Sequence, residues 1–121
     1  MTDQASPKPY DLEERTFEFA RDVRKFLKTV PRTIANIEDG RQLIRSSGSV
    51  GANYREANES LSKKDFKLRI RIARKEAKES VYWLRLIDTG AADSVNEVRD
   101  ALTLEATELM RILAAILRKS E

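Results

Sequence analysis

Basic side chains between residues 62 and 89 carry the strongest chemical signal in the sequence. This stretch holds nine Lys or Arg residues against four acidic ones, although the 121-residue chain has a net charge of only +3. Like charges on one side of a helix repel one another, so an anionic partner would stabilise them. A nucleic-acid backbone is the commonest such partner. Seven of these side chains are spaced to share one side of a helix, and we call them the basic ridge: Lys64, Lys67, Arg71, Arg74, Lys75, Lys78 and Arg85.

The charge pattern supports two interpretations of the basic ridge. In the first, its side chains contact the phosphates of RNA or DNA. In the second, the ridge is a solvated face whose charges pair with Asp and Glu of neighbouring helices or subunits. Residues 93–121 contain six acidic residues that could form such pairs. Tyr82 and Trp83 could stack on bases, but their spacing is more typical of a core or an interface.

A second apolar stripe is predicted on the same helix, apart from the positions that a core requires. Because a bundle helix buries one stripe, a second stripe needs another partner. We expect this stripe to form a homo-oligomer interface. The alternative is an irregular bundle in which both stripes lie inside one wide core. The stripe consists of Leu68, Ile72, Tyr82, Trp83 and Leu86.

The residue types that most enzymes need are missing. The chain has no His and no Cys, which removes the commonest general base, the commonest metal ligand and any thiolate chemistry. The glutamates between residues 56 and 79 therefore lack the His partners of a di-iron carboxylate centre. The glycines at 48 and 51 lack the surrounding residues of a phosphate-binding loop. We expect a protein that is not an enzyme, with no catalytic, metal-binding or cofactor-binding residues.

No targeting signal is visible in the sequence. There is no run of about 18 apolar residues that could cross a membrane. The N-terminus also lacks the basic region and apolar run of a signal peptide. A cytoplasmic protein with no membrane partner is the expectation.

Helical periodicity accounts for nearly the whole chain beyond residue 10. Apolar residues recur at steps of three and four in segments at about 11–30, 32–59, 62–89 and 94–120. Short connections link these segments, which predicts an all-α fold: an antiparallel up-down-up-down four-helix bundle, as a single domain over residues 11–120. Residues 1–10 are expected to form a flexible N-terminal tail. Pro31 is predicted to end the first helix and open the second. Capping boxes are predicted for Asp11 with Glu14, Ser62 with Asp65, and Ser94 with Glu97.

Glycines interrupt the second predicted helix. Gly40, Gly48 and Gly51 would each cost about 1 kcal/mol relative to Ala inside a helix. Either the helix breaks near residues 46–49, or close packing against another helix offsets this cost. We favour close packing, because small residues also occupy the middle of the third predicted helix. The expected contact is antiparallel, between the small residues of 46–52 and those of 73–80.

Three segments of the sequence closely resemble the four-helix-bundle proteins encoded within intervening sequences of bacterial 23S ribosomal RNA genes. They are YDLEERTFEFARDVRKFL, IRSSGSVGANYREANESLSKKDF and RIARKEAKESVYWLRLI, which together span residues 10–87. The resemblance implies an antiparallel four-helix bundle that assembles as a homopentameric ring. It also implies kinship with the accessory protein of diversity-generating retroelements, a basic pentamer that binds a reverse transcriptase and nucleic acid. It supplies no functional-residue motif.

These observations lead to one hypothesis and one alternative. The hypothesis is a non-enzymatic, cytoplasmic, oligomeric bundle that binds structured RNA or DNA through the basic ridge. The alternative is a protein-interaction scaffold, an accessory subunit with no direct role at nucleic acid. Salt separates the two in part, because phosphate contacts weaken log-linearly as salt rises.

Overall fold

The computed structural model describes residues 11–121, and the predicted flexible tail, residues 1–10, lies outside the described residues. The described part of the chain consists of four α-helices and their connections, with no strand. The helices are α1 (Leu12–Leu27), α2 (Ile34–Asn58), α3 (Lys63–Leu86) and α4 (Asp93–Lys119). The predicted all-α fold is confirmed.

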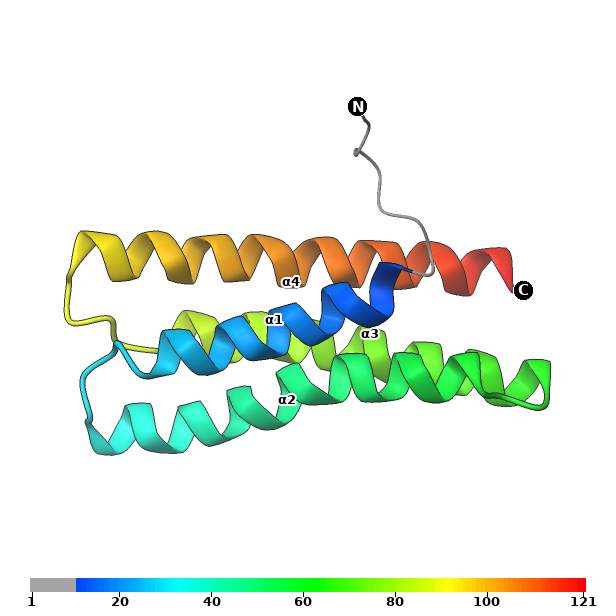
Figure 1. Ribbon diagram of the computed structural model, residues 1–121, viewed down its shortest axis with the longest axis horizontal. Helices are drawn as coiled ribbons and strands as arrows, with labels where there is room; N and C mark the ends of the chain where they lie inside the picture. The colour runs from blue at the N-terminus through cyan, green and yellow to red at the C-terminus, as the bar shows by residue number, and fades with distance from the viewer. Residues whose placement is uncertain (1–10) are drawn as a thin grey trace, which may run out of the picture.

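The four helices form an elongated bundle in which consecutive helices run in opposite directions (Figure 1). Each helix packs against the helices before and after it in the chain, and α1 also packs against α4. The diagonal pairs do not pack against each other, so the helices occupy the corners of a square in chain order. The contact between α2 and α3 is the most extensive. That between α1 and α4 is the smallest.

The core follows the predicted helical periodicity. On α3 the buried positions recur at steps of three and four, as the sequence predicts. They are Ile70, Ala73, Ala77, Ser80 and Leu84, and Ile87 is buried directly after the helix ends. The largest buried side chains opposite them include Phe19 and Phe26 of α1 and Leu109 and Leu113 of α4. This arrangement leaves the other sides of α3 free for charged residues.

α2 is one continuous helix through Gly48 and Gly51, so packing rather than a helix break explains this segment. Part of the predicted contact with α3 is present: the buried hydroxyls of Ser46 and Ser80 lie 2.9 Å apart. However, the tightest packing at a glycine of α2 is against α1, not against α3. A Cβ added at Gly51 would lie 2.8 Å from Oγ1 of Thr16 on α1. The prediction that the small residues of α2 serve the α3 contact was therefore only partly right.

Two of the predicted helix starts need correction. Ser62 caps α3 as expected, accepting a hydrogen bond from the backbone N–H of Asp65. Thr33 caps α2, and Pro31 lies in the connection before it.

α4 begins at Asp93, because Gly90 and Ala91 turn the chain with positive φ and place Ala92 at the N-cap. Ser94 therefore lies inside the first turn, where its hydroxyl cannot cap the helix. Asp11 occupies the N-cap of α1 without a side-chain capping bond.

Hydrogen bonds of buried and half-buried polar side chains join neighbouring parts of the bundle. The side-chain amide of Asn36 donates to the carbonyl oxygens of Pro31 and Asp88, and its oxygen accepts from the Asp88 N–H. These bonds join the α1–α2 connection to the α3–α4 connection. Between α1 and α4, Arg15 forms a two-pronged ion pair with Glu105 at 2.7 and 2.9 Å. Hydrogen bonding to Glu105 raises the pKa of Arg15 above its ordinary value.

Candidate nucleic-acid interface

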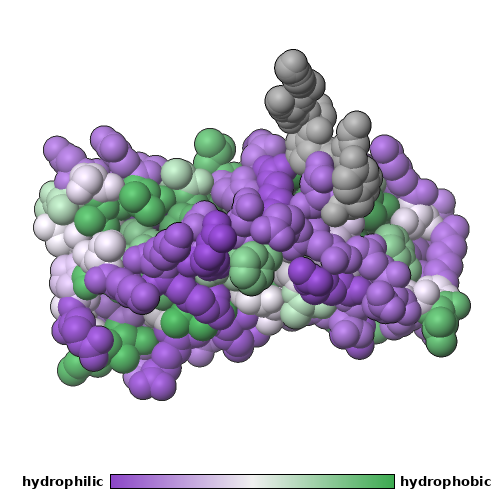
Figure 2. Space-filling model, viewed as in Figure 1, coloured by the Kyte–Doolittle hydropathy of each residue, from purple (hydrophilic) through white to green (hydrophobic). Residues whose placement is uncertain are grey.

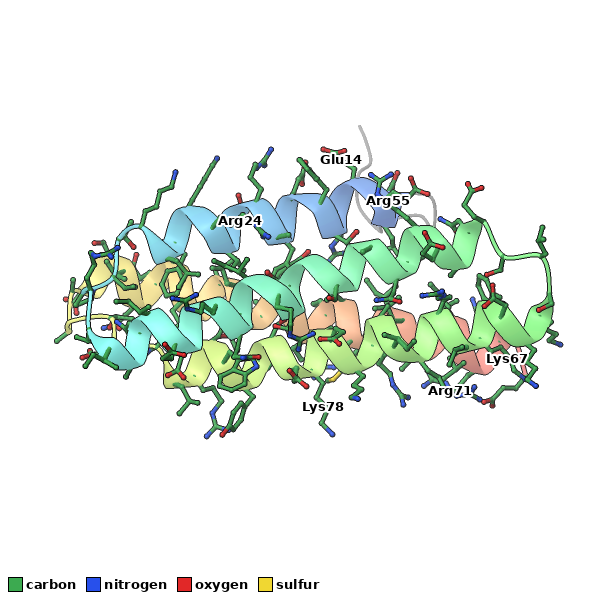
Figure 3. The ribbon with its side chains drawn as sticks, turned by 90° about the horizontal axis from the view of Figure 1, so that it is seen from below. Glu14, Arg24, Arg55, Lys67, Arg71 and Lys78 are labelled. Atoms are coloured by element: carbon green, nitrogen blue, oxygen red, sulfur yellow. The ribbon has the colours of Figure 1, made fainter. Side chains whose placement is uncertain are left out.

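Helix α3 separates its charges by sign. Its two central acids, Glu76 and Glu79, lie on the side that faces α2, where both contact Arg45. The distances from Arg45 Nη2 are 3.3 Å to Glu76 and 2.9 Å to Glu79. The cations of the basic ridge follow the other side of the helix, toward α4. Lys67, Arg71 and Lys78 project outward along one edge of the bundle in Figure 3.

The basic ridge has no internal counter-charge. Within residues 11–121, none of its seven side chains forms an ion pair or a side-chain hydrogen bond. Two acids of α4 pair with other cations: Glu105 binds Arg15 on the α1 side, and Glu108 lies 3.3 Å from Arg111, which is beside the ridge but not part of it. Within residues 11–121, the structure shows no ion pair between the ridge and the acids of neighbouring helices.

A shallow groove between α3 and α4 gathers most of the ridge into one surface. Its volume is about 670 Å³ and its lining contains five cations and no acid. We call it the basic groove: Arg71, Arg74, Lys75, Lys78, Met110, Arg111 and Ala114. Clustered cations over a small apolar floor attract phosphate groups at long range and let them approach closely.

The structure does not bring all the predicted residues together. Lys64 and Arg71 line a second, smaller depression with Leu68 near the start of α3. Arg85 is exposed near the opposite end of α3 and lines neither cavity. Sequence reasoning missed Arg111, because its charge lies on a predominantly acidic segment. Only the side-by-side packing of α3 and α4 places it beside the ridge.

The predicted interface stripe is divided between surface and core. The exposed fractions of Leu68, Tyr82 and Leu86 are 50%, 54% and 46%. Ile72 is half-buried, and Trp83 packs against the core. The Trp83 indole N–H donates to Glu79, and its ring meets Tyr82 edge-on at 5.0 Å. Three large apolar side chains of α3 thus remain open to a partner.

In residues 11–121, no three acidic side chains are grouped so that they could hold a metal ion. None of the helices in this part of the chain is long and apolar enough to cross a membrane.

Fold and surface together define a small helical bundle with a cation-lined groove. The sequence profile of the 23S rRNA-intervening sequence proteins matches residues 9–115, nearly the whole described chain. The chain belongs to this family. No curated protein matches it.

One similar solved structure is a protein of unknown function from the S23 ribosomal protein family of Bacteroides thetaiotaomicron. It is 29% identical, with a TM-score of 0.75, and the match covers 93% of this chain and 99% of that one. Neither comparison points to an enzymatic activity.

Proposed function

We propose that this chain is a non-enzymatic, cytoplasmic, oligomeric bundle that binds structured RNA or DNA through the basic ridge and the basic groove. The observation that carries the proposal is the absence of any counter-charge for the seven ridge cations within residues 11–121. Each cation that meets a phosphate releases a condensed counterion, which supplies sequence-independent affinity.

The dimensions of the ridge suit a nucleic-acid backbone. From Lys67 to Lys78 the helix rises about 16 Å, at about 1.5 Å per residue. That length corresponds to about five base pairs of a duplex, since each strand places a phosphate about every 3.4 Å. Extended Lys and Arg side chains on a convex helix reach phosphates more readily than base edges, so we expect little sequence preference.

Assembly would multiply this surface. The exposed side chains of Leu68, Tyr82 and Leu86 support a subunit contact on the outer side of α3. Several ridges in one particle would bind a long nucleic acid more tightly than a single ridge, through effective concentration alone.

The direct test is fluorescence anisotropy with a labelled structured RNA and a labelled duplex DNA, at about 50 and about 200 mM salt. Light scattering on the free protein gives its mass under the same conditions. We expect submicromolar binding at the lower salt and a steep loss at the higher salt. A folded protein that binds neither probe at low salt would overturn the proposal in favour of the scaffold, whose ridge would meet an acidic protein instead.

A further inference from the structure

The basic groove between α3 and α4 combines exposed cations with an apolar floor. The floor consists of Met110 and Ala114, which are half-buried, and Met110 packs against the core. The volume of the groove, about 670 Å³, lies within the range of about 300–1,000 Å³ that is typical of sites for small organic ligands. A row of phosphates would occupy only the cations and leave the floor empty. We call the five exposed cations the rim: Arg71, Arg74, Lys75, Lys78 and Arg111.

Apolar surface alone does not distinguish this groove from the rest of the molecule. Hydrophobic side chains also reach the surface between hydrophilic ones on the face that includes α1 (Figure 2). The depression between α1 and α2 is lined by three arginines, but two of them pair with carboxylates of α1. In the basic groove, four of the five rim cations have no ion pair within residues 11–121. Apolar surface and unneutralised positive charge therefore coincide between α3 and α4.

The rim and the floor suit different parts of a nucleotide. The rim cations suit phosphates, whereas the floor suits the flat face of a base. In a duplex the bases are paired and stacked on one another, so a duplex offers phosphates and base edges but no base face. An unpaired strand offers a phosphate and a base face in every nucleotide. The groove as a whole is therefore complementary to unpaired nucleotides, and only its rim is complementary to a duplex.

Three of the five rim cations are arginines, which can contact a base as well as a phosphate. The planar guanidinium of arginine stacks on aromatic faces, whereas the lysine ammonium acts as a point charge. Arg71 and Arg74 have no ion pair within residues 11–121. The side chain of Arg111 is 68% exposed, and its Nη1 lies 3.3 Å from Glu108. Stacking contacts the faces of bases rather than their edges, so the groove needs no particular sequence.

We propose that the basic groove binds an unpaired stretch of a nucleic-acid strand, with a base on the floor and the adjoining phosphates on the rim. The ridge cations outside the groove contact phosphates farther along the strand. This preference rests on the proposed function and deepens it, because it names the part of a structured nucleic acid that the groove recognises: a loop or an open end rather than a stem. The ridge cations outside the groove are Lys64, Lys67 and Arg85.

Three labelled DNA probes test the preference with the unaltered chain, by fluorescence anisotropy. They are an unstructured strand of about 12 nucleotides, a strand of the same length with abasic sites in place of its bases, and a duplex of the same length. The two strands carry the same number of phosphates, so only the bases differ. We expect the abasic strand to bind at least about 10-fold more weakly, with a similar salt-dependence slope. Equal affinity of the two strands would overturn the preference and leave the proposed function standing, whereas binding of none of the probes would overturn both.

Ala114→Leu fills the floor without changing any charge. Ala115→Leu is the matched control, because Ala115 is also half-buried on α4 but does not line the groove. We expect Ala114→Leu to weaken binding of the strand with bases at least about 10-fold, and to change binding of the abasic strand and the duplex by less than about twofold. Ala115→Leu should leave all three affinities unchanged, and circular dichroism checks that both variants stay helical. Equal losses on all three probes, or equal losses in the two variants, would overturn the assignment of the floor as a base-binding surface.

Discussion

The two long sides of α3 both carry polar groups but use them differently. Toward α2, small residues bring the helices close, two hydroxyls bond in the core, and Arg45 neutralises Glu76 and Glu79. Toward α4, the cations of the basic ridge stand side by side with no partner within residues 11–121. The first side is satisfied by the fold. The second is the side to which we propose that an anion from outside the chain binds.

The row of cations on the α4-facing side of α3 does not stabilise the folded chain. Several ridge cations are four residues apart, including Lys67 and Arg71, and Arg74 and Lys78. Each such pair destabilises the helix by a few tenths of a kcal/mol. Substitutions on and around α3 test whether this contrast between its two sides holds.

Neutralising the ridge should remove nucleic-acid binding and leave the fold intact. The variant is K67Q/R71Q/R74Q/K78Q. Since each phosphate contact contributes about 0.9 to the salt-dependence slope on duplex DNA, the slope should fall by about 3 to 4 and the low-salt affinity by at least about 100-fold. Its free energy of unfolding should equal or exceed that of the unaltered chain, because like-charge repulsion is relieved. Anisotropy and urea denaturation measure the two quantities.

The matched control removes the same number of positive charges elsewhere: K25Q/K28Q/R45Q/K119Q. We expect this variant to keep most of its affinity, because these side chains lie away from the basic groove. Equal losses in the two variants would mean that net charge, rather than the ridge, governs binding.

Gly51→Ala tests the close packing of α2 against α1. The added Cβ would lie 2.8 Å from Oγ1 of Thr16, so we expect a loss of about 1–3 kcal/mol in the free energy of unfolding. Gly48→Ala is the control: its Cβ meets only a flexible arginine, and the better helix propensity should stabilise the chain by up to about 1 kcal/mol. Opposite signs in urea denaturation would support the packing assigned to these glycines. A stabilising Gly51→Ala would contradict it.

Ser46→Ala tests the buried hydroxyl pair between α2 and α3. Ser80 would keep its bond to the carbonyl of Glu76 but lose the hydroxyl that it contacts at 2.9 Å. We expect a cost of about 0.5–1.5 kcal/mol, and little further cost when Ser80→Ala is added. Thermal denaturation of both singles and the double measures this. A double variant that costs the sum of two large singles would show that the hydroxyls do not act as a pair.

Arg45→Gln should have the smallest effect. Its guanidinium is half-exposed, so its ion pairs with Glu76 and Glu79 contribute about 0–1 kcal/mol. The change removes the cation that faces Glu76 and Glu79, and Glu79 keeps the hydrogen bond from the Trp83 indole N–H. Nucleic-acid affinity should change little. A loss as large as that of the ridge variant would contradict the proposal that only the α4-facing side of α3 binds nucleic acid.

Much of this architecture could be predicted from the sequence. The four helices, the buried positions of α3 and the Ser62 cap all follow from local spacing and local hydrogen bonds. Periodicity shows which side of a helix is buried, but not which neighbour covers it. The contact of Gly51 with Thr16, rather than with α3, therefore needed the structure.

The candidate nucleic-acid site was likewise only partly predictable from the sequence. The basic ridge is visible from spacing alone, whereas the role of Arg111 and the engagement of the α4 acids depend on tertiary contacts. The starts of α2 and α4 were misplaced for a local reason. The prediction used the nearest Pro or Ser, while Thr33 and the positive-φ turn at Gly90 and Ala91 determine where the chain enters each helix.

Lysine footprinting tests whether the basic ridge is the nucleic-acid surface, because it locates the bound nucleic acid without altering the chain. Acetylation with and without duplex DNA, read by mass spectrometry, compares two sets of lysines. We expect protection of Lys64, Lys67, Lys75 and Lys78, and unchanged reactivity at Lys25, Lys28 and Lys119. Protection confined to the second set, or equal reactivity throughout despite measurable binding, would contradict the assignment of the basic ridge as the nucleic-acid surface.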